Sequence, residues 1–258
     1  MRLPAVNVLT LYALPGIGEV QAGDSLSELV LEASSRAGHR LQPGDILVIA
    51  QKIVSKAEGR RILLADIEPT ERAVALGAAA DKDPRVMELV LRESRAVLRV
   101  KRGVVIVEHR LGFVMANAGV DRSNVGSESD EYALLLPEDP DASAARLRDE
   151  LGMACGIDIG VVINDSFGRA WRNGVTGVAI GVAGVPALID MRGTSDRDGR
   201  ELKVTEIAAA DELAAAASLL MGQAGEGTPV VLARGFPYTL RESSIAELIR
   251  PRDQDLFR

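Results

Sequence analysis

The chain of 258 residues is 47% hydrophobic and 26% charged, which is typical of a globular protein that buries a sizeable core. Its net charge of −7 and its aromatic content of 3% argue against nucleic-acid binding, which needs a basic surface or rings that stack on bases. The single cysteine, Cys155, excludes an intramolecular disulfide and a cysteine-rich zinc site, and no apolar run approaches the roughly 20 residues that cross a bilayer.

Hydrophobic periodicity predicts strands and helices in mixed order along the first half of the chain. The N-terminal segment is predicted to hold a strand at 6–12 rather than a secretion signal, because it lacks a small-residue cleavage site, and we expect a cytoplasmic protein. Ser25, with Glu28 three residues later, marks the start of a helix. The other predicted elements are a turn at 43–45, a buried strand at 46–50, helices beginning near 70 and 84, strands at 97–107 and 112–118 around a turn at 108–110, and a polar loop at 121–130.

The second half continues in the same mixed order. Its predicted elements are a helix at 141–151, strands at 159–163, 178–183 and 186–191, a charged turn at 193–201, a strand at 202–207, an alanine-rich helix at 208–221, a glycine loop at 222–227, a strand at 229–233 and a short helix at 243–249. Because strands and helices do not alternate regularly, the predicted fold class is α+β with mixed sheets. Residues 1–258 contain neither a repeat nor a long linker, so we expect a single domain of one or two lobes, with Cys155 as a small core residue.

The stretch 161–181 is the most informative part of the chain. Its apolar run leads into Asp165 and Ser166, which are followed by Arg169 and Arg172, and we interpret these polar residues as a loop at the end of a buried strand. A carboxylate beside a hydroxyl suits a hard cation such as Mg²⁺ or Mn²⁺. The two arginines suit phosphate or carboxylate groups. The alternative interpretation is a solvated loop with ordinary salt bridges.

Three further regions carry candidate functional residues. Asp121 lies in a polar loop where it could bind a metal, and Asn124 in the same loop could bind a base or a sugar. Gln51 and Lys56 follow a buried strand, where a lysine could neutralise phosphates. The glycine loop near 222–227 could bring backbone N–H groups to phosphate, although it lacks the Gly-Lys-Ser/Thr of a P-loop. Taken alone, each of these features is more typical of an ordinary turn or a solvated surface.

Taken together, longer segments carry a more specific signal. The most distinctive motifs are SKAEGR (55–60), GVDRSN (119–124) and LLPEDPDASA (135–144), and with the other matching segments they resemble the coenzyme F420-0:L-glutamate ligases, also called coenzyme F420 γ-glutamyl ligases. The segments follow the family's order and cover nearly the whole chain. They are 14–24, 44–60, 116–126, 134–144, 161–184, 198–222 and 228–235.

The resemblance implies a GTP-dependent ligase that adds L-glutamate to the deazaflavin precursor F420-0 and then adds further γ-linked glutamates. It also implies a family-specific mixed fold, an intertwined homodimer, and a requirement for Mg²⁺ or Mn²⁺, with K⁺ as a further candidate. No nucleic-acid or membrane partner is expected. Two other functions fit the same residues: a metal-dependent kinase or phosphotransferase that acts on another small carboxylate, and a non-enzymatic carrier that binds a deazaflavin.

Carried over residue by residue, the resemblance implies a metal site and a nucleotide site, with Asp121, Asp165 and Lys56 as the catalytic residues. The implied metal ligands are Asp121, Asp165, Ser166 and Gln223. The implied nucleotide contacts are Ile17, Gly18, Glu19, Val20, Gln51, Lys56, Asn124, Met221, Gly222, Gln223, Ala224, Gly225, Glu226, Gly227 and Thr228. Some relatives carry Glu at the position of Gln223, so this chain lacks a charged ligand there. The resemblance assigns no role to Arg169 and Arg172, which we expect from their chemistry to hold a substrate carboxylate or phosphodiester.

Overall fold

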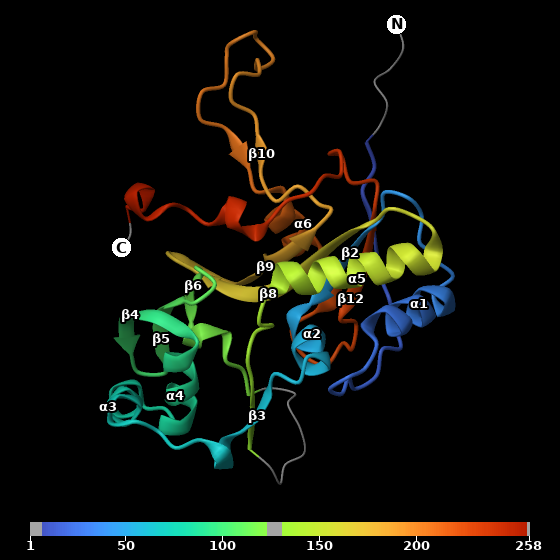
Figure 1. The fold of residues 1–258 in the computed structure, drawn as a ribbon. Helices are drawn as coiled ribbons and strands as arrows, with labels where there is room; N and C mark the ends of the chain where they lie inside the picture. The colour runs from blue at the N-terminus through green and yellow to red at the C-terminus, as the bar shows by residue number, and fades with distance from the viewer. Residues whose placement is uncertain (1–6, 123–130, 257–258) are drawn as a thin grey trace, which may run out of the picture.

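A mixed five-stranded sheet forms the centre of the computed structural model, which describes residues 7–122 and 131–256 (Figure 1). The strands lie in the order β1 (Thr10–Ala13), β12 (Val230–Arg234), β2 (Ile46–Ala50), β8 (Gly160–Arg169) and β9 (Arg172–Ala183). Strands β2 and β8 are parallel, and the other neighbouring pairs are antiparallel. The sheet and the helices confirm the predicted α+β class.

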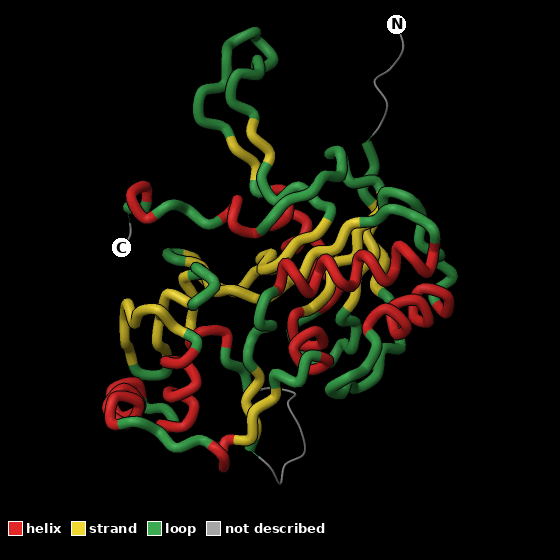
Figure 2. Tube along the Cα trace, viewed as in Figure 1, coloured by secondary structure: helices red, strands yellow, loops and turns green. Residues whose placement is uncertain are grey.

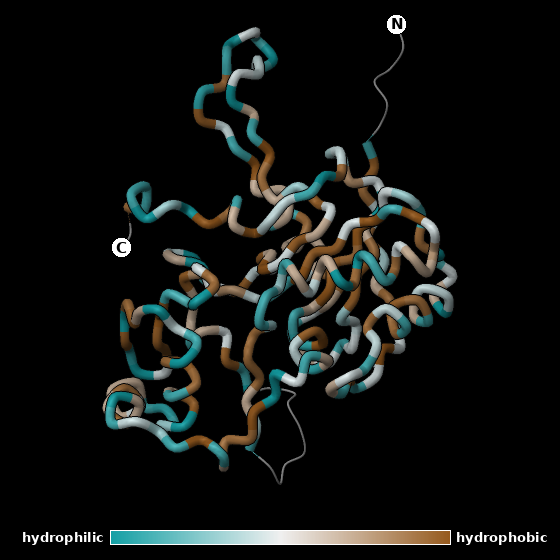
Figure 3. Tube along the Cα trace, viewed as in Figure 1, coloured by the Kyte–Doolittle hydropathy of each residue, from teal (hydrophilic) through white to brown (hydrophobic). Residues whose placement is uncertain are grey.

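Helices cover this sheet, and the part of the molecule built around it is called the main lobe. The helices are α1 (Leu26–Arg36), α2 (Gln51–Ala57), α5 (Pro140–Cys155) and α6 (Ala209–Met221). These helices bury both faces of β2 and of the first half of β8. The two strands therefore consist of continuous apolar residues and do not alternate between apolar and polar ones. The same strands form a continuous hydrophobic centre in Figure 3. Helix α1 begins as predicted, since the Ser25 side chain accepts a hydrogen bond from the Glu28 backbone N–H.

A second hydrophobic cluster defines a small lobe, which runs from Arg61 to Arg122 and resumes at Glu131 through Leu135. Its elements are β3 (Arg61–Leu63), α3 (Glu71–Ala80), α4 (Pro84–Arg92), β4 (Ser94–Lys101), β5 (Val104–His109), β6 (Val114–Ala116), β7 (Tyr132–Leu134) and the short 3₁₀ helices at Leu64–Asp66 and Asn117–Gly119. The lobe lies at the lower left of Figure 1.

An extended arm projects from the main lobe between residues 189 and 207 (Figure 2). Only its base is regular, where β10 (Ile189–Asp190) pairs with β11 (Glu206–Ile207), and most of its residues are exposed. After α6 and β12, the C-terminal region contains two 3₁₀ helices, Ile245–Leu248 and Arg252–Gln254. Within the described ranges, no helix is both long enough and apolar enough to cross a membrane.

Several predicted elements differ from the structure. The strand predicted at 97–107 is a hairpin, because the chain reverses between β4 and β5 at Gly103, whose φ of +87° favours glycine. The strands predicted at 186–191 and 202–207 shrink to the two-residue base of the arm, since the charged segment between them has no sheet to join. Cys155 is exposed at the end of α5 rather than buried in a core.

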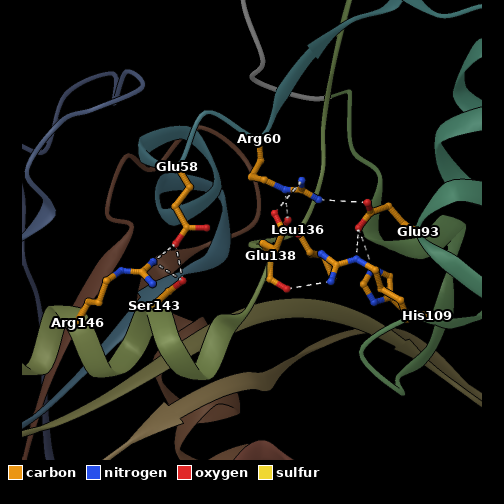
Figure 4. Close-up of polar contacts among 9 residues, drawn as sticks. Glu58, Arg60, Glu93, His109, Leu136, Glu138, Ser143 and Arg146 are labelled. Carbon is orange, nitrogen blue, oxygen red and sulfur yellow. Dashed lines mark hydrogen bonds and ion pairs between the residues drawn. The ribbon is translucent and has the colours of Figure 1, made fainter.

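A network of charged side chains joins the two lobes beside α4 (Figure 4). The Glu93 carboxylate accepts hydrogen bonds from Arg60 Nη2 at 3.1 Å and Arg110 Nε at 2.9 Å, and His109 Nε2 lies 3.5 Å from it. Burial alone would raise the pKa of Glu93. The adjacent His109, the hydrogen bond from Arg110, and the charges of Arg110 and Arg60 outweigh burial and lower the pKa to about 2.

This lowered pKa predicts how acid affects the wild-type protein and a Glu93→Gln variant. The ionised Glu93 contributes stability that is fully present above its usual pKa of 4.5 and is lost as the pH falls through about 2. We expect wild type to exceed Glu93→Gln in free energy of unfolding by on the order of 3 kcal/mol at pH 6. Urea unfolding between pH 6 and pH 2 measures whether this difference shrinks with acid, and a difference that stays constant would contradict the assignment.

Candidate functional site

Asp165 and Ser166 lie within a strand and not in the loop that the sequence predicts. Strand β8 continues to Arg169 and pairs with β9, with Asp165 opposite Val178 and Ser166 opposite Gly177. The prediction was wrong because the partner strand follows the polar segment in sequence and supplies its hydrogen bonds. The ladder is irregular between Ile163 and Asn164, immediately before the acidic residue. Such irregularities often lie beside functional sites, where they change the direction of a side chain.

Two cavities meet at this part of β8. One has a volume of about 480 Å³ and the other about 750 Å³. Gln51, Asp165 and Ser166 line both of them. A group bound near Asp165 and Ser166 is therefore accessible from two different binding spaces.

The smaller cavity gathers most of the residues predicted to contact a nucleotide. The predicted residues that line it are Ile17, Gly18, Glu19, Gln51, Lys56, Met221, Gly222, Gln223, Ala224, Gly225, Gly227 and Thr228. Val20 and Glu226 do not line it: Val20 is buried in the hydrophobic core, and the Glu226 carboxylate accepts a hydrogen bond from the Ala224 backbone N–H. Asn124 lies outside the described residues.

Lys56 is held inside this cavity by helix α2. Its side chain is only 10% exposed, and its Nζ donates a hydrogen bond to Glu19 Oε1 at 2.6 Å. This burial contradicts the alternative of a freely solvated lysine. An ammonium group at the wall of a polar cavity is available to an anionic ligand, with Glu19 as its counterion in the ligand-free protein.

The glycine loop closes the end of the smaller cavity at the C-terminus of α6. Gly222 has a φ of +73° and a ψ of −175°, a backbone conformation that strongly favours glycine. Thr228 fastens the other end of the loop, because its Oγ1 donates a hydrogen bond to the Leu220 carbonyl oxygen at 2.9 Å. The loop is thus held at both ends against the helix.

Asp165 carries a carboxyl group whose negative charge is only partly compensated. Burial raises its pKa to about 6 against the hydrogen bond from the Ser166 backbone N–H, and the nearby charge of Asp121 adds to the rise, whereas Lys52 and Gln51 oppose it. Lys52 also approaches Asp121, with 2.6 Å between its Nζ and Oδ2. Lys52 was not among the residues predicted from sequence, because α2 was not predicted as a helix. In the structure Lys52 lies on α2, one turn before Lys56.

The donors at this position fit a hard cation better than a soft one. Asp165 and Ser166 line both cavities, whereas Asp121 lines only the larger one and Gln223 only the smaller one. All four side chains offer only oxygen atoms and amide groups, which suit Mg²⁺ or Mn²⁺ and do not suit a structural zinc. Across residues 7–122 and 131–256, no group of three or more His, Cys, Asp or Glu side chains could hold a metal. A cation here would therefore complete its coordination with water or with phosphate oxygens.

The larger cavity has an apolar wall whose residues were not predicted from sequence. The small lobe contributes an apolar surface made of Val104, Ile106, Val114 and Ala116 on β5 and β6. Arg169 and Arg172 face the same space from the β8–β9 hairpin, near its tip. A cavity with an apolar wall and two guanidinium groups in its lining suits a ligand that has an aromatic ring and an anionic tail.

Comparisons with known proteins agree with this arrangement. The family model described as F420-0:gamma-glutamyl ligase matches residues 16–235. The chain belongs to this ligase family. It is 45% identical over 252 residues to a coenzyme F420:L-glutamate ligase of Methanothermobacter thermautotrophicus, and the match covers 97% of this chain and 99% of the relative. The corresponding proteins of Methanopyrus kandleri and Halobacterium salinarum are 46% identical over 254 residues and 42% over 253, covering 97% and 96% of this chain and 98% and 94% of the relatives.

As a member of this family, the chain is a ligase. We expect the buried carboxylate of Asp165 to lower the free energy of unfolding when no cation is bound beside it. Because burial raises the folded-state pKa of Asp165 from 3.8 to about 6, the ionised carboxylate opposes folding above pH 6, and this cost disappears as the pH falls through 3.8. We expect Asp165→Asn to raise the free energy of unfolding at pH 8 by up to about 3 kcal/mol. Urea unfolding with a chelator at pH 8 and pH 4 tests this, and equal stability of both proteins at pH 8 would refute it.

Proposed function

We propose that this chain is a GTP-dependent ligase that joins L-glutamate to coenzyme F420-0 and then adds further γ-linked glutamates. The observation that carries the proposal is the meeting of a polar cavity and a partly apolar cavity at Asp165 and Ser166. A ligase of this kind must bring a nucleotide phosphate to a carboxylate of a second substrate. Two cavities with a common acidic junction provide that arrangement.

In this proposal GTP occupies the smaller cavity. The Lys56 ammonium group lies beside its phosphates, and the glycine loop offers backbone N–H groups to them. The deazaflavin ring of F420-0 packs on Val104, Ile106 and Val114 in the larger cavity. Arg169 and Arg172 bind its anionic groups.

The reaction then has two steps. A carboxylate oxygen of F420-0 attacks the γ-phosphorus of GTP. The bond between this phosphorus and the β–γ bridging oxygen breaks, so GDP departs and F420-0 becomes an acyl phosphate. The glutamate amine next attacks the acyl carbon, the carbon–oxygen bond to phosphate breaks, and the nitrogen loses a proton as the amide forms. Phosphoryl transfer depends mainly on positioning and on neutralising charge, which the rigid β8 strand and Lys56 provide. Mg²⁺ or Mn²⁺ held by Asp121, Asp165, Ser166 and Gln223 would stabilise the charge on the transferring phosphoryl group.

We also propose that the protein is a homodimer. The arm at 189–207 extends away from the rest of the chain (Figure 2), and Val204 on it is 85% exposed. Trp171 at the tip of the β8–β9 hairpin and Leu219 on α6 are 83% and 84% exposed. A second copy of the chain would remove these apolar side chains from water.

Mass spectrometry of the products tests the proposed reaction. F420-0 incubated with the protein, GTP, L-glutamate and Mg²⁺ or Mn²⁺ should gain glutamate, and GDP and phosphate should accumulate only when both other substrates are present. A stable phosphorylated product without glutamate would instead identify a kinase. Binding of F420-0 with no consumption of GTP would identify a carrier.

Lys56→Ala should impair the use of GTP more than the use of glutamate. The reason is that Lys56 lines the smaller cavity, where it meets phosphate, and does not line the larger one. We expect the KM for GTP to rise by about tenfold or more, since a charge-assisted contact contributes about 1.5–3 kcal/mol. Steady-state kinetics with each substrate varied in turn measure this. Unchanged constants for GTP in a folded variant would leave Lys56 as a structural partner of Glu19.

Gln223→Glu should tighten divalent-cation binding. Glu offers a charged carboxylate where Gln offers a neutral carbonyl oxygen, and hard cations prefer the former. The cation concentration for half-maximal activity should therefore fall, with no effect at saturation. Gln223→Asn is the matched control, because it shortens the side chain without adding charge. A titration curve for Gln223→Glu that overlays wild type would place residue 223 outside the metal site.

A further inference from the structure

The two acidic residues of the site come from different lobes. Asp165 lies on β8 of the main lobe. Asp121 belongs to the small lobe, where its backbone pairs with Leu134: the Asp121 N–H donates at 3.0 Å, and the Leu134 N–H donates back at 2.8 Å. The larger cavity likewise takes its walls from both lobes. The separation of the two carboxylates therefore depends on how the small lobe is held against the main lobe.

The chain enters and leaves the small lobe through two segments that lie side by side. Arg60 is in the entering segment, and Leu135 and Leu136 are in the leaving one. The Leu135 N–H donates to the Arg60 carbonyl oxygen at 3.1 Å, and Arg60 Nε donates to the Leu136 carbonyl oxygen at 2.9 Å. Figure 4 shows the Arg60 side chain crossing from one segment toward the other. Arg60 therefore joins the entering segment to the leaving segment through both its backbone and its side chain.

Glu93 connects this crossing point to the body of the small lobe. It follows the last residue of α4, and its carboxylate accepts from Arg60 Nη2 at 3.1 Å and from Arg110 Nε at 2.9 Å. Arg110 in turn donates through Nη1 to the Glu138 carbonyl oxygen at 2.9 Å, on the leaving segment. One carboxylate, 8% exposed as a residue, therefore binds two arginines that both reach the crossing segments.

We propose that Glu93 and Arg60 are positioning residues of the active site, which hold the small lobe so that Asp121 faces Asp165. This inference rests on the proposed metal-dependent ligase activity. The Phe113 ring also packs edge-on against Phe167 across the lobes, with 5.9 Å between centroids, so loss of the Glu93 contacts loosens the lobe without detaching it. Such loosening would disturb the proposed metal ligands, because Asp121 and Asp165 come from different lobes. It would not disturb the smaller cavity, since all the residues that line that cavity belong to the main lobe.

Glu88 provides a matched control on the same helix. It is 6% exposed, which is as buried as Glu93, and its carboxylate accepts hydrogen bonds from Thr70 and from Arg92 Nε at 2.9 Å. All of these partners lie within the small lobe. Glu88→Gln should therefore destabilise the small lobe without changing its position relative to β8.

The test measures Mn²⁺ binding to the full-length protein by electron paramagnetic resonance of the free ion, together with the midpoint of thermal unfolding. Glu93→Gln should weaken Mn²⁺ binding by about tenfold, a typical effect for residues that couple to a site through a packed network. Glu88→Gln should bind Mn²⁺ as wild type does, even though its unfolding midpoint falls. The affinity for GDP should be the same in all three proteins when no divalent cation is present.

A double-variant cycle tests whether Glu93 acts through Asp121. In an Asp121→Asn background, Glu93→Gln should produce no further loss of Mn²⁺ affinity, because the ligand that it positions is already gone. Additive losses in the two variants would overturn the proposal. If Glu93→Gln fails to fold by circular dichroism, Arg60→Gln takes its place with the same expected results.

The outcomes separate this inference from the proposed function. If wild type does not bind Mn²⁺, or if Asp165→Ala binds it equally well, the proposed metal site is wrong. If Asp165→Ala loses binding while Glu93→Gln matches wild type, the metal site stands and the positioning role of Glu93 is wrong. Equal weakening by Glu93→Gln and Glu88→Gln would also overturn the positioning role, since it would show only that the small lobe must be stable.

Discussion

The parallel pairing of β2 with β8 is the constraint on which the site depends. Its register places Ala50 beside Asn164, so the residues that follow in each strand emerge at the same edge of the sheet. Helix α2, with Gln51 and Lys56, begins directly after β2, and Asp165 follows on β8. A shift of this register by one residue would turn the carboxylate to the opposite face of the sheet. The apolar runs of the two strands, buried on both faces, make such a shift costly.

Two further strands bring their connecting loops to the same edge. Strand β12 is antiparallel to β2, so the glycine loop that precedes it ends beside Ala50, whose N–H donates to the Pro229 carbonyl oxygen at 2.8 Å. Strand β1 is antiparallel to β12, and the segment after it, with Ile17 to Glu19, leaves the sheet at that same side. Segments separated by some two hundred positions in sequence thus form one cavity. The cause is the order and direction of the strands.

Sequence alone predicted the parts of this arrangement that depend on local pattern. The buried runs at 46–50 and 159–163 were recognisable as strands, and the order of the motifs led to the family before any contact was known. The pairing of the polar end of β8 with β9 was not predictable, because its partner residues read as a glycine-rich loop. The apolar wall of Val104, Ile106 and Val114 was also missed, since valines and isoleucines in a strand look the same whether they face a core or a cavity. Lys52 was not predicted as a site residue because α2, the helix that carries it, was not predicted from the sequence.

The side-by-side crossings at Arg60 and Leu135 have a consequence for how such a protein can diversify. A segment whose two ends lie together behaves as an insertion in the body that carries it, and insertions of this kind can be exchanged without disturbing the surrounding fold. Here the insertion carries the apolar wall of the larger cavity, while the residues that line the smaller cavity stay in the host. In the proposed ligase, selection could therefore remodel the apolar part of the acceptor site by altering the small lobe alone. Such remodelling would have to retain Asp121, the carboxylate that the lobe supplies to the proposed metal site, and Glu93, which we propose holds the lobe in place.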